Sequence, residues 1–228
     1  MSDANTPPDA AEPETKSEQA YGLLRDMIVR LDFAPGDVLR EDELQDSLKL
    51  GRTPIREALQ RLEREHFVTV IPRRGMYVTG IDVSELSMLF ETRTVLEPYA
   101  ARLAAVRGVD ADWDTMEAAL AGTGSGVSKV EHLAVDRVCH EIMWRASGNR
   151  FLWDTLDMLY AQSDRLWHLY LADVADMEDA VVEHQAILAA LRAGDADTSA
   201  SLVEAHVQSF DTQVRAAVTA GLEAPLAQ

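Results

Sequence analysis

Three runs of apolar residues at helical spacing follow one another in the N-terminal third of the chain. The first run predicts a helix that stops before the turn at Pro35-Gly36, and the second predicts a short helix over 41–48. We expect the third helix to begin with Thr53 as its N-cap and Pro54 at its first position, because these residue types are favoured there. The apolar positions of the first and third helices are Tyr21, Leu24, Ile28 and Leu31, and Ile55, Ala58, Leu59 and Leu62.

Beyond the third helix the apolar period changes from that of a helix to that of a strand. The segments 67–71 and 76–78 are rich in β-branched and aromatic residues, and the turn 72–75 between them reads Pro-Arg-Arg-Gly. Three helices followed by a hairpin with a basic tip are typical of a winged helix-turn-helix. We therefore expect a DNA-binding domain of this kind over 17–80.

From Ser84 onward the pattern is almost entirely helical, and breaks that contain Gly or Asp separate six runs. Helices joined by short breaks pack as antiparallel neighbours. We predict a mainly α protein: a disordered tail over 1–16, a winged helix-turn-helix over 17–80, and an all-α antiparallel helical bundle over 81–228. The six helices expected in the bundle cover 84–107, 112–121, 128–147, 149–171, 176–193 and 196–220.

Composition fits such a protein and indicates its cellular compartment. The chain has 228 residues, of which 47% are apolar, so it can bury a core in one large or two modest domains. A single cysteine, Cys139, excludes a disulfide framework and a multi-cysteine zinc site, and fits a reducing compartment. The tail has no apolar signal segment, and no run reaches the roughly 18 apolar residues of a membrane span. We expect a cytoplasmic protein without a membrane partner.

The net charge of the whole chain argues against binding to nucleic acid, but the charge of its separate segments does not. The whole sequence carries 21 Lys and Arg against 39 Asp and Glu, a net charge of -18. Residues 81–228 account for -14 of this total, whereas residues 17–80 carry only -1. Within 49–74, seven basic residues face three acids, a net charge of +4. A basic patch therefore lies inside an acidic protein, at the predicted DNA-binding helix and hairpin.

The third helix carries side chains suited to reading DNA. Arg52, Thr53 and Arg56 lie at or near its N-terminus and face away from the apolar stripe. In a recognition helix these positions point into the major groove, where arginine can bind guanine with two hydrogen bonds. The alternative is that the arginines are solvated partners of nearby glutamates on an exposed helix face. The basic hairpin tip favours DNA binding, because Arg73 and Arg74 can enter a minor groove or contact the phosphate backbone.

These residues carry a family resemblance. The chain resembles the winged-helix domain of GntR-type bacterial transcription regulators, which implies that Arg52, Thr53 and Arg56 contact the operator and that Arg73, Arg74 and Gly75 form the wing. The resemblance rests on three strings: Pro35-Gly36-Asp37-Val38-Leu39 with Glu41 and Leu44, then Arg52-Thr53-Pro54-Ile55-Arg56-Glu57-Ala58-Leu59-Gln60-Arg61-Leu62-Glu63, then Pro72-Arg73-Arg74-Gly75-Met76-Tyr77-Val78.

The predicted bundle contains a second constellation. Asp136 and His140 are four residues apart on one helix and share a mostly apolar face. His184 and His206 lie ten and eleven residues from the Gly194-Asp195 break, so two antiparallel helices would bring them level. Three imidazoles and one carboxylate predict a site for a divalent transition metal of zinc or nickel type. The alternative is that each histidine is a core residue satisfied by a single hydrogen bond.

The same region resembles the FCD effector-binding domain of the FadR-like branch of GntR regulators. This resemblance implies that Asp136 and the three histidines hold a metal, and that Arg93 and Asn149 contact an effector. Arg93 shares its helix face with apolar residues and is expected to point inward, where it pairs either with a ligand carboxylate or with Glu97. The matching segments are 90–97, Asp136-Arg137-Val138-Cys139-His140, Ser147-Gly148-Asn149, 183–195 and Ala205-His206.

Together these patterns predict a homodimeric transcription regulator, a repressor, whose operator binding responds to a small organic acid held at the metal. One alternative keeps DNA binding but makes the metal structural, without an effector. A metal-dependent hydrolase is the other alternative, but His140-Glu141 does not continue to the second histidine of HExxH, because Trp144 stands in its place. We therefore expect no enzymatic activity.

Overall fold

The computed structural model describes residues 15–80, 82–123, 127–170 and 178–223, and the expected tail over 1–16 lies almost wholly outside them. The chain divides into two compact units with their boundary between Gly80 and Ile81. Each unit has a separate core. The observed architecture, a winged helix-turn-helix and an all-helical bundle, confirms the predicted mainly α fold class.

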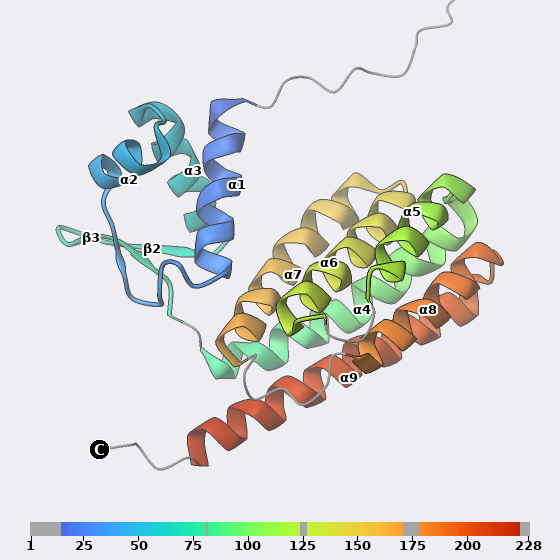
Figure 1. The fold of residues 1–228 in the computed structure, drawn as a ribbon. Coiled ribbons are helices and arrows are strands. Elements are labelled where there is room, and N and C mark those ends of the chain that lie inside the picture. The colour runs from blue at the N-terminus through green and yellow to red at the C-terminus, as the bar shows by residue number, and fades with distance from the viewer. Residues whose placement is uncertain (1–14, 81, 124–126, 171–177, 224–228) are drawn as a thin grey trace, which may run out of the picture. The chain divides into compact units, whose positions relative to one another are not determined.

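The first unit is a three-helix domain with a small sheet (Figure 1). Its sheet is antiparallel with strand order β1-β3-β2, and Ile71 pairs with Gly75 next to the tip of the β2–β3 hairpin. The core lies where the apolar stripes of the first and third helices meet, so that Leu24, Ile28, Ile55 and Leu59 have no exposed surface. The elements are α1 (Lys16–Val29), β1 (Val38–Leu39), α2 (Glu41–Leu48), α3 (Arg52–Arg64), β2 (Val68–Ile71) and β3 (Gly75–Val78).

Two details of the first unit differ from the sequence prediction. Helix α3 begins at Arg52 with Gly51 as its N-cap, so Thr53 is the second helical residue and its predicted capping role is wrong. Pro54 is the third helical residue and not the predicted first, a position that accepts proline because the first four N–H groups of a helix have no intrahelical acceptor. Strand β1 was not expected; it has two residues, and pairing with Tyr77 and Met76 defines it.

The second unit is an antiparallel bundle of long helices (Figure 1). Helices α4 and α9 run beside each other along most of their length, and the remaining helices pack around them. Predicted and observed helix boundaries agree within three residues. The helices are α4 (Val83–Arg107), α5 (Asp110–Ala121), α6 (Lys129–Ala146), α7 (Arg150–Tyr170), α8 (Glu178–Arg192) and α9 (Ala196–Glu223).

The bundle core combines aliphatic and aromatic residues, with Trp144 and Trp167 almost completely buried. Alongside them it buries charged and polar side chains, among them Arg93, Glu97 and Asp136. Such groups are stable inside a protein only when they are paired. Within the described part of the chain, no helix is long and apolar enough to cross a membrane.

Candidate metal centre and DNA-binding surface

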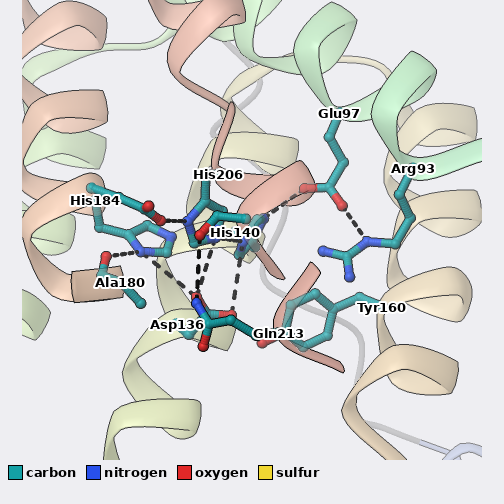
Figure 2. Close-up of polar contacts among 11 residues, drawn as sticks. Arg93, Glu97, Asp136, His140, Tyr160, Ala180, His184, His206 and Gln213 are labelled. Atoms are coloured by element: carbon teal, nitrogen blue, oxygen red, sulfur yellow. Dashed lines mark hydrogen bonds and ion pairs between the residues drawn. The ribbon is translucent and has the colours of Figure 1, made fainter. Parts of the chain in front are cut away.

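Four side chains from three helices of the bundle converge on one buried point. Asp136 and His140 come from α6, His184 from α8 and His206 from α9, and none of them is more than 3% exposed. One candidate ligand atom of each residue lies within 4.8 Å of those of the other three. Figure 2 shows the side chains turned toward one another. The structure thus brings together all four residues that the sequence predicted to bind a metal.

Each of the three histidines has an outer partner at Nδ1. His140 Nδ1 lies 2.7 Å from Glu97 Oε2, and His206 Nδ1 lies 2.6 Å from Glu183 Oε2. His184 Nδ1 lies 2.9 Å from the carbonyl oxygen of Ala180. An acceptor at Nδ1 favours a ring proton there and leaves Nε2 as the nitrogen that can bind a metal. Nε2 of His140 and Nε2 of His206 are only 3.2 Å apart, so the inward-facing nitrogens of two rings meet at one point.

The carboxylate of Asp136 is divided between two environments. Oδ2 accepts a hydrogen bond of 2.5 Å from the hydroxyl of Tyr160 on α7. Oδ1 is buried, and among the described residues it accepts no hydrogen bond, although His206 Nε2 and His184 Nδ1 lie 3.5 and 3.7 Å away. An ionised carboxylate oxygen in such a place needs a positive partner.

Electrostatics keep the site charged and its histidines different from one another. Burial would raise the pKa of Asp136, but the nearby histidines hold that pKa far below its usual range. Burial and the charge of His206 lower the pKa of His184 to about 3. Burial opposes the charge of His206 too, but the carboxylates of Asp136 and Glu183 raise its pKa to about 9. The carboxylate of Asp136 therefore stabilises positive charge on a neighbouring imidazole, that of His206.

The donor set fits a divalent transition metal. One carboxylate and three imidazoles are typical zinc and nickel ligands. In a tetrahedral site, bonds of about 2.0–2.1 Å place two ligand atoms about 3.4 Å apart. The 3.2 Å between Nε2 of His140 and Nε2 of His206 already fits this value, whereas the widest pair of the cluster, which spans up to 4.8 Å, must move closer. The unpartnered Asp136 Oδ1 and the facing Nε2 atoms are the groups that a cation would satisfy.

Arg93 and Asn149, the two predicted effector residues, lie in different places. Arg93 is buried on α4, and its Nε donates to Glu97 Oε1 at 2.6 Å, while Nη1 has no partner among the described residues. Asn149 follows the end of α6 and accepts a hydrogen bond from Leu152 N, which is a helix-capping contact. The structure therefore brings Arg93 to the cluster through Glu97 and leaves Asn149 at the beginning of α7.

Sequence reasoning gave no site role to Glu97, Glu183 or Tyr160. Glu97 entered only as an alternative partner of Arg93, and its contact with His140 crosses from α4 to α6. Glu183 directly precedes the candidate ligand His184 but contacts His206 instead. A buried Glu on a face shared with Arg93 was the one signal that could have marked the first of these.

The predicted DNA-reading residues lie on one exposed face of the first unit. Arg52 and Arg56 project from the first turns of α3, with 69% and 57% of their side chains exposed. Glu41 on α2 lies between them, 3.3 Å from Arg52 Nε and 3.4 Å from Arg56 Nε. A shallow depression at this point is also lined by Thr53. The opposite face of α3 is the buried apolar stripe, so the helix can present this polar face to a groove of DNA.

The hairpin tip is exposed as well. Arg73 and Arg74 occupy the turn between β2 and β3, where the amide of Arg74 donates to Ile71 O at 3.0 Å. Arg73 has φ 65° and Gly75 has φ 111°, a left-handed backbone that closes the turn and suits glycine at the second position. The turn thus holds two arginines at the end of a short hairpin.

Comparisons with known proteins agree with both units. The family model described as "Bacterial regulatory proteins, gntR family" matches residues 16–78, and the model described as "FCD domain" matches residues 88–209. These two ranges cover the winged helix-turn-helix and nearly all of the helices around the four-residue cluster.

Full-length relatives are regulators of the same size. The Nta operon transcriptional regulator of Aminobacter aminovorans is 32% identical over 199 residues, covering 85% of this chain and 93% of that protein. The HTH-type transcriptional repressor RspR of Escherichia coli (strain K12) is 26% identical over 202 residues, covering 87% and 89%. The solved structure of E. coli McbR/YncC shares the fold, with a TM-score of 0.79 at 20% identity, and the match covers 89% of this chain and 98% of that one.

Proposed function

We propose that this chain, which belongs to the GntR family of bacterial regulatory proteins and carries an FCD domain, is a repressor whose operator binding responds to a small organic acid. As a member of that family it is a DNA-binding transcription regulator rather than an enzyme. The observation that carries this proposal is the joint presence of an exposed arginine face on α3 and a buried three-histidine, one-aspartate cluster in the bundle.

Operator recognition is assigned to the exposed face of α3 and the wing. Arg52, Thr53 and Arg56 would enter the major groove, where the two guanidiniums exchange Glu41 for guanine edges or phosphates. The wing, with Arg73, Arg74 and Gly75, would contact the adjacent minor groove or backbone. Exposure of both arginines on α3 supports this assignment, since an exposed ion pair exchanges its partner at little cost.

The cluster is assigned to a divalent transition metal, zinc or nickel, bound by Asp136, His140, His184 and His206. When bound, such an ion supplies a Lewis-acidic position for an oxygen ligand. Burial of all four residues and the outer partner at each histidine Nδ1 support this assignment.

A small carboxylate is the proposed effector, with Arg93 as its second anchor. Arg93 is 1% exposed, yet its Nη1 has no hydrogen-bond partner among the described residues. A buried guanidinium nitrogen without a partner is costly, and a carboxylate is its natural ligand. The effector would shift the relative placement of two winged domains in a dimer.

A homodimer would form through the outer face of α4. Four large apolar side chains on this face are exposed at intervals of 7, 4 and 7 residues: Met88 by 58%, Val95 by 70%, Tyr99 by 52% and Val106 by 73%. A second copy running antiparallel would place Met88 against Val106 and Val95 against Tyr99. The two recognition helices of such a dimer would read half-sites about one helical turn apart.

The proposal is tested with DNA selected from a random pool by the wild-type protein. Binding to this DNA is measured by fluorescence anisotropy for metal-loaded and chelated protein, across a panel of small carboxylates. We expect at least one acid to change the affinity of the metal-loaded protein by 5- to 150-fold, the range of about 1–3 kcal/mol typical of allosteric coupling. If the affinity for DNA stays unchanged across the panel and after chelation, the proposed response to a small acid at the metal site is contradicted.

A purely structural metal is the second candidate, because Glu97 already occupies Nε of Arg93. In that case chelation lowers the melting temperature while no acid alters either stability or DNA binding. Thermal shift on the same samples therefore separates the two functions.

A further inference from the structure

We propose that Glu97 is a positioning residue that couples the guanidinium of Arg93 to the metal site through His140. This inference rests on the proposed metal site and goes beyond it, because Glu97 is not one of the four ligands. It assigns a task to a buried charge whose presence the ligand set alone does not explain.

The two oxygens of Glu97 serve two different partners. Oε1 accepts from Arg93 Nε at 2.6 Å, and Oε2 lies 2.7 Å from His140 Nδ1, a close ion-pair contact without the alignment of a hydrogen bond. Glu97 has no exposed surface, and the side chains of Arg93 and His140 are 1% exposed. Figure 2 shows the chain of contacts running from Arg93 through Glu97 to the imidazole of His140. Water therefore has no access to screen these interactions.

Glu97 determines which nitrogen of His140 is available. At 2.7 Å an unprotonated Nδ1 would place its lone pair against a carboxylate oxygen, so the ring proton belongs on Nδ1 and Nε2 is the nitrogen left for a metal. His140 Nε2 is the atom that faces His206 Nε2 at 3.2 Å and Asp136 Oδ2 at 3.8 Å. Outer partners of this kind also raise the basicity of the ligating nitrogen.

Glu97 differs from the other outer partners of the site. Glu183 holds His206 in the same way, but its side chain is 35% exposed and solvent can share its charge. Ala180 offers a neutral carbonyl to His184. Among these three contacts, only the one made by Glu97 is tied to a cation that is itself a proposed effector anchor.

Arg93 therefore modulates His140 through Glu97. While Nη1 of Arg93 has no anion, the guanidinium charge draws electron density of the Glu97 carboxylate away from His140. An anion at Nη1 would offset that charge, and the full carboxylate would act on the ring. Anion binding should then raise metal affinity, and metal should raise anion affinity by the same factor.

The positioning role is tested by measuring zinc affinity. Full-length protein stripped of metal competes for zinc with a chromophoric chelator. The variant is Glu97→Gln, which has the same shape but can donate its amide N–H to His140 Nδ1 and so favour the wrong tautomer. We expect 10- to 100-fold weaker zinc binding, the usual effect of losing an outer partner. Glu91→Gln is the matched control, because it removes one carboxylate from an exposed position of the same helix.

Coupling is tested with Arg93→Met. The effects of Arg93→Met and Glu97→Gln on zinc affinity should be non-additive, whereas those of Arg93→Met and Glu183→Gln should add. Histidine ¹⁵N spectra of the metal-free protein give a readout independent of zinc: His140 should carry its proton on Nδ1 in the wild type and lose this preference in Glu97→Gln. If Glu97→Gln unfolds the bundle, Arg93→Met and Arg93→Lys carry the same test, with Arg93→Met changing zinc affinity at least fivefold and Arg93→Lys changing it less.

Three results would overturn the proposal. Zinc affinity in Glu97→Gln within twofold of wild type, with the tautomer unchanged, removes the positioning role while leaving the metal site intact. Additive effects of Arg93→Met and Glu97→Gln remove the coupling. Wild-type protein that binds neither zinc nor nickel contradicts the metal of the proposed function, and this inference with it.

Discussion

The molecule uses arginine and glutamate together in two places, and the two arrangements differ in almost every physical respect. On the DNA-binding unit, Glu41 contacts Arg52 and Arg56 at 3.3 and 3.4 Å, and both arginines are more than half exposed. In the bundle, Glu97 contacts Arg93 at 2.6 Å, and neither side chain is more than 1% exposed. The first arrangement can exchange its partners, whereas the second is fixed by its surroundings.

The energy of each arrangement follows from its exposure. An exposed ion pair contributes about 0–1 kcal/mol, because water and salt screen it, so leaving Glu41 for DNA costs little. A buried pair has lost its hydration, and each charge depends on the other. Burial works against the charge of Glu97, yet Arg93 and His140 together lower its pKa to about 2. The surface pair is thus suited to a reversible contact, and the buried pair to holding geometry.

The largest expected effect comes from breaking the buried pair. Glu97→Ala should lower the free energy of unfolding of the bundle by about 3–5 kcal/mol, because it leaves the Arg93 charge uncompensated. Urea denaturation followed by tryptophan fluorescence measures this effect in the bundle alone, since all four tryptophans lie in residues 81–228. The double variant Arg93→Met, Glu97→Leu should lose less than the sum of its parts. A loss below 1 kcal/mol for Glu97→Ala would show that the pair is not effectively buried.

The next effect concerns the exposed arginines. Arg56→Ala should weaken binding to the selected DNA by about 5- to 150-fold, or 1–3 kcal/mol, if the side chain reads a base. Its effect on unfolding should stay within about 0.5 kcal/mol, as for most surface substitutions. Anisotropy titrations at two salt concentrations measure both the loss and its salt dependence. Arg150→Ala, which removes an exposed arginine from the bundle, is the control. An equal loss of affinity in this control would show that Arg56 contributes only nonspecific electrostatic attraction.

The smallest expected effect comes from the shared acid of the exposed arrangement. Glu41→Gln should change the free energy of unfolding by less than about 1 kcal/mol. It should raise affinity for random DNA more than for selected DNA, because it frees two guanidiniums and removes a nearby negative charge. Glu43→Gln on the same helix, which loses only the contact with Arg40, provides the comparison. Equal gains on both kinds of DNA would show that Glu41 acts only through its charge.

Local periodicity predicted most of the fold, because both domains are built from amphipathic helices. Helix boundaries in the bundle agree within three residues. His184 and His206 lie at nearly equal distances from the Gly194-Asp195 break, and this spacing predicted that they meet. One failure occurred where a contact crosses between elements, because strand β1 exists by pairing with β3. The other failure is local: Gly51 has the extended backbone of an N-cap, so α3 begins one residue before Thr53.

The outer partners of the cluster show the same limit. No spacing along the chain connects Glu97 with His140 or Tyr160 with Asp136, because each contact joins two helices whose relative rotation depends on packing throughout the bundle. The four candidate ligands could be predicted from the sequence, whereas the groups that orient them became visible only in three dimensions.

The geometry of the cluster also has a meaning in terms of chain connectivity. Its candidate ligands and their outer partners come from α4, α6, α7, α8 and α9, and the most distant of them, Glu97 and His206, are separated by 109 positions in the sequence. An ion at this point would be a crosslink with several arms, and crosslinks that close long loops restrict the unfolded chain most. Metal uptake would then slow hydrogen exchange in five helices at once, including the two helices that donate no ligand.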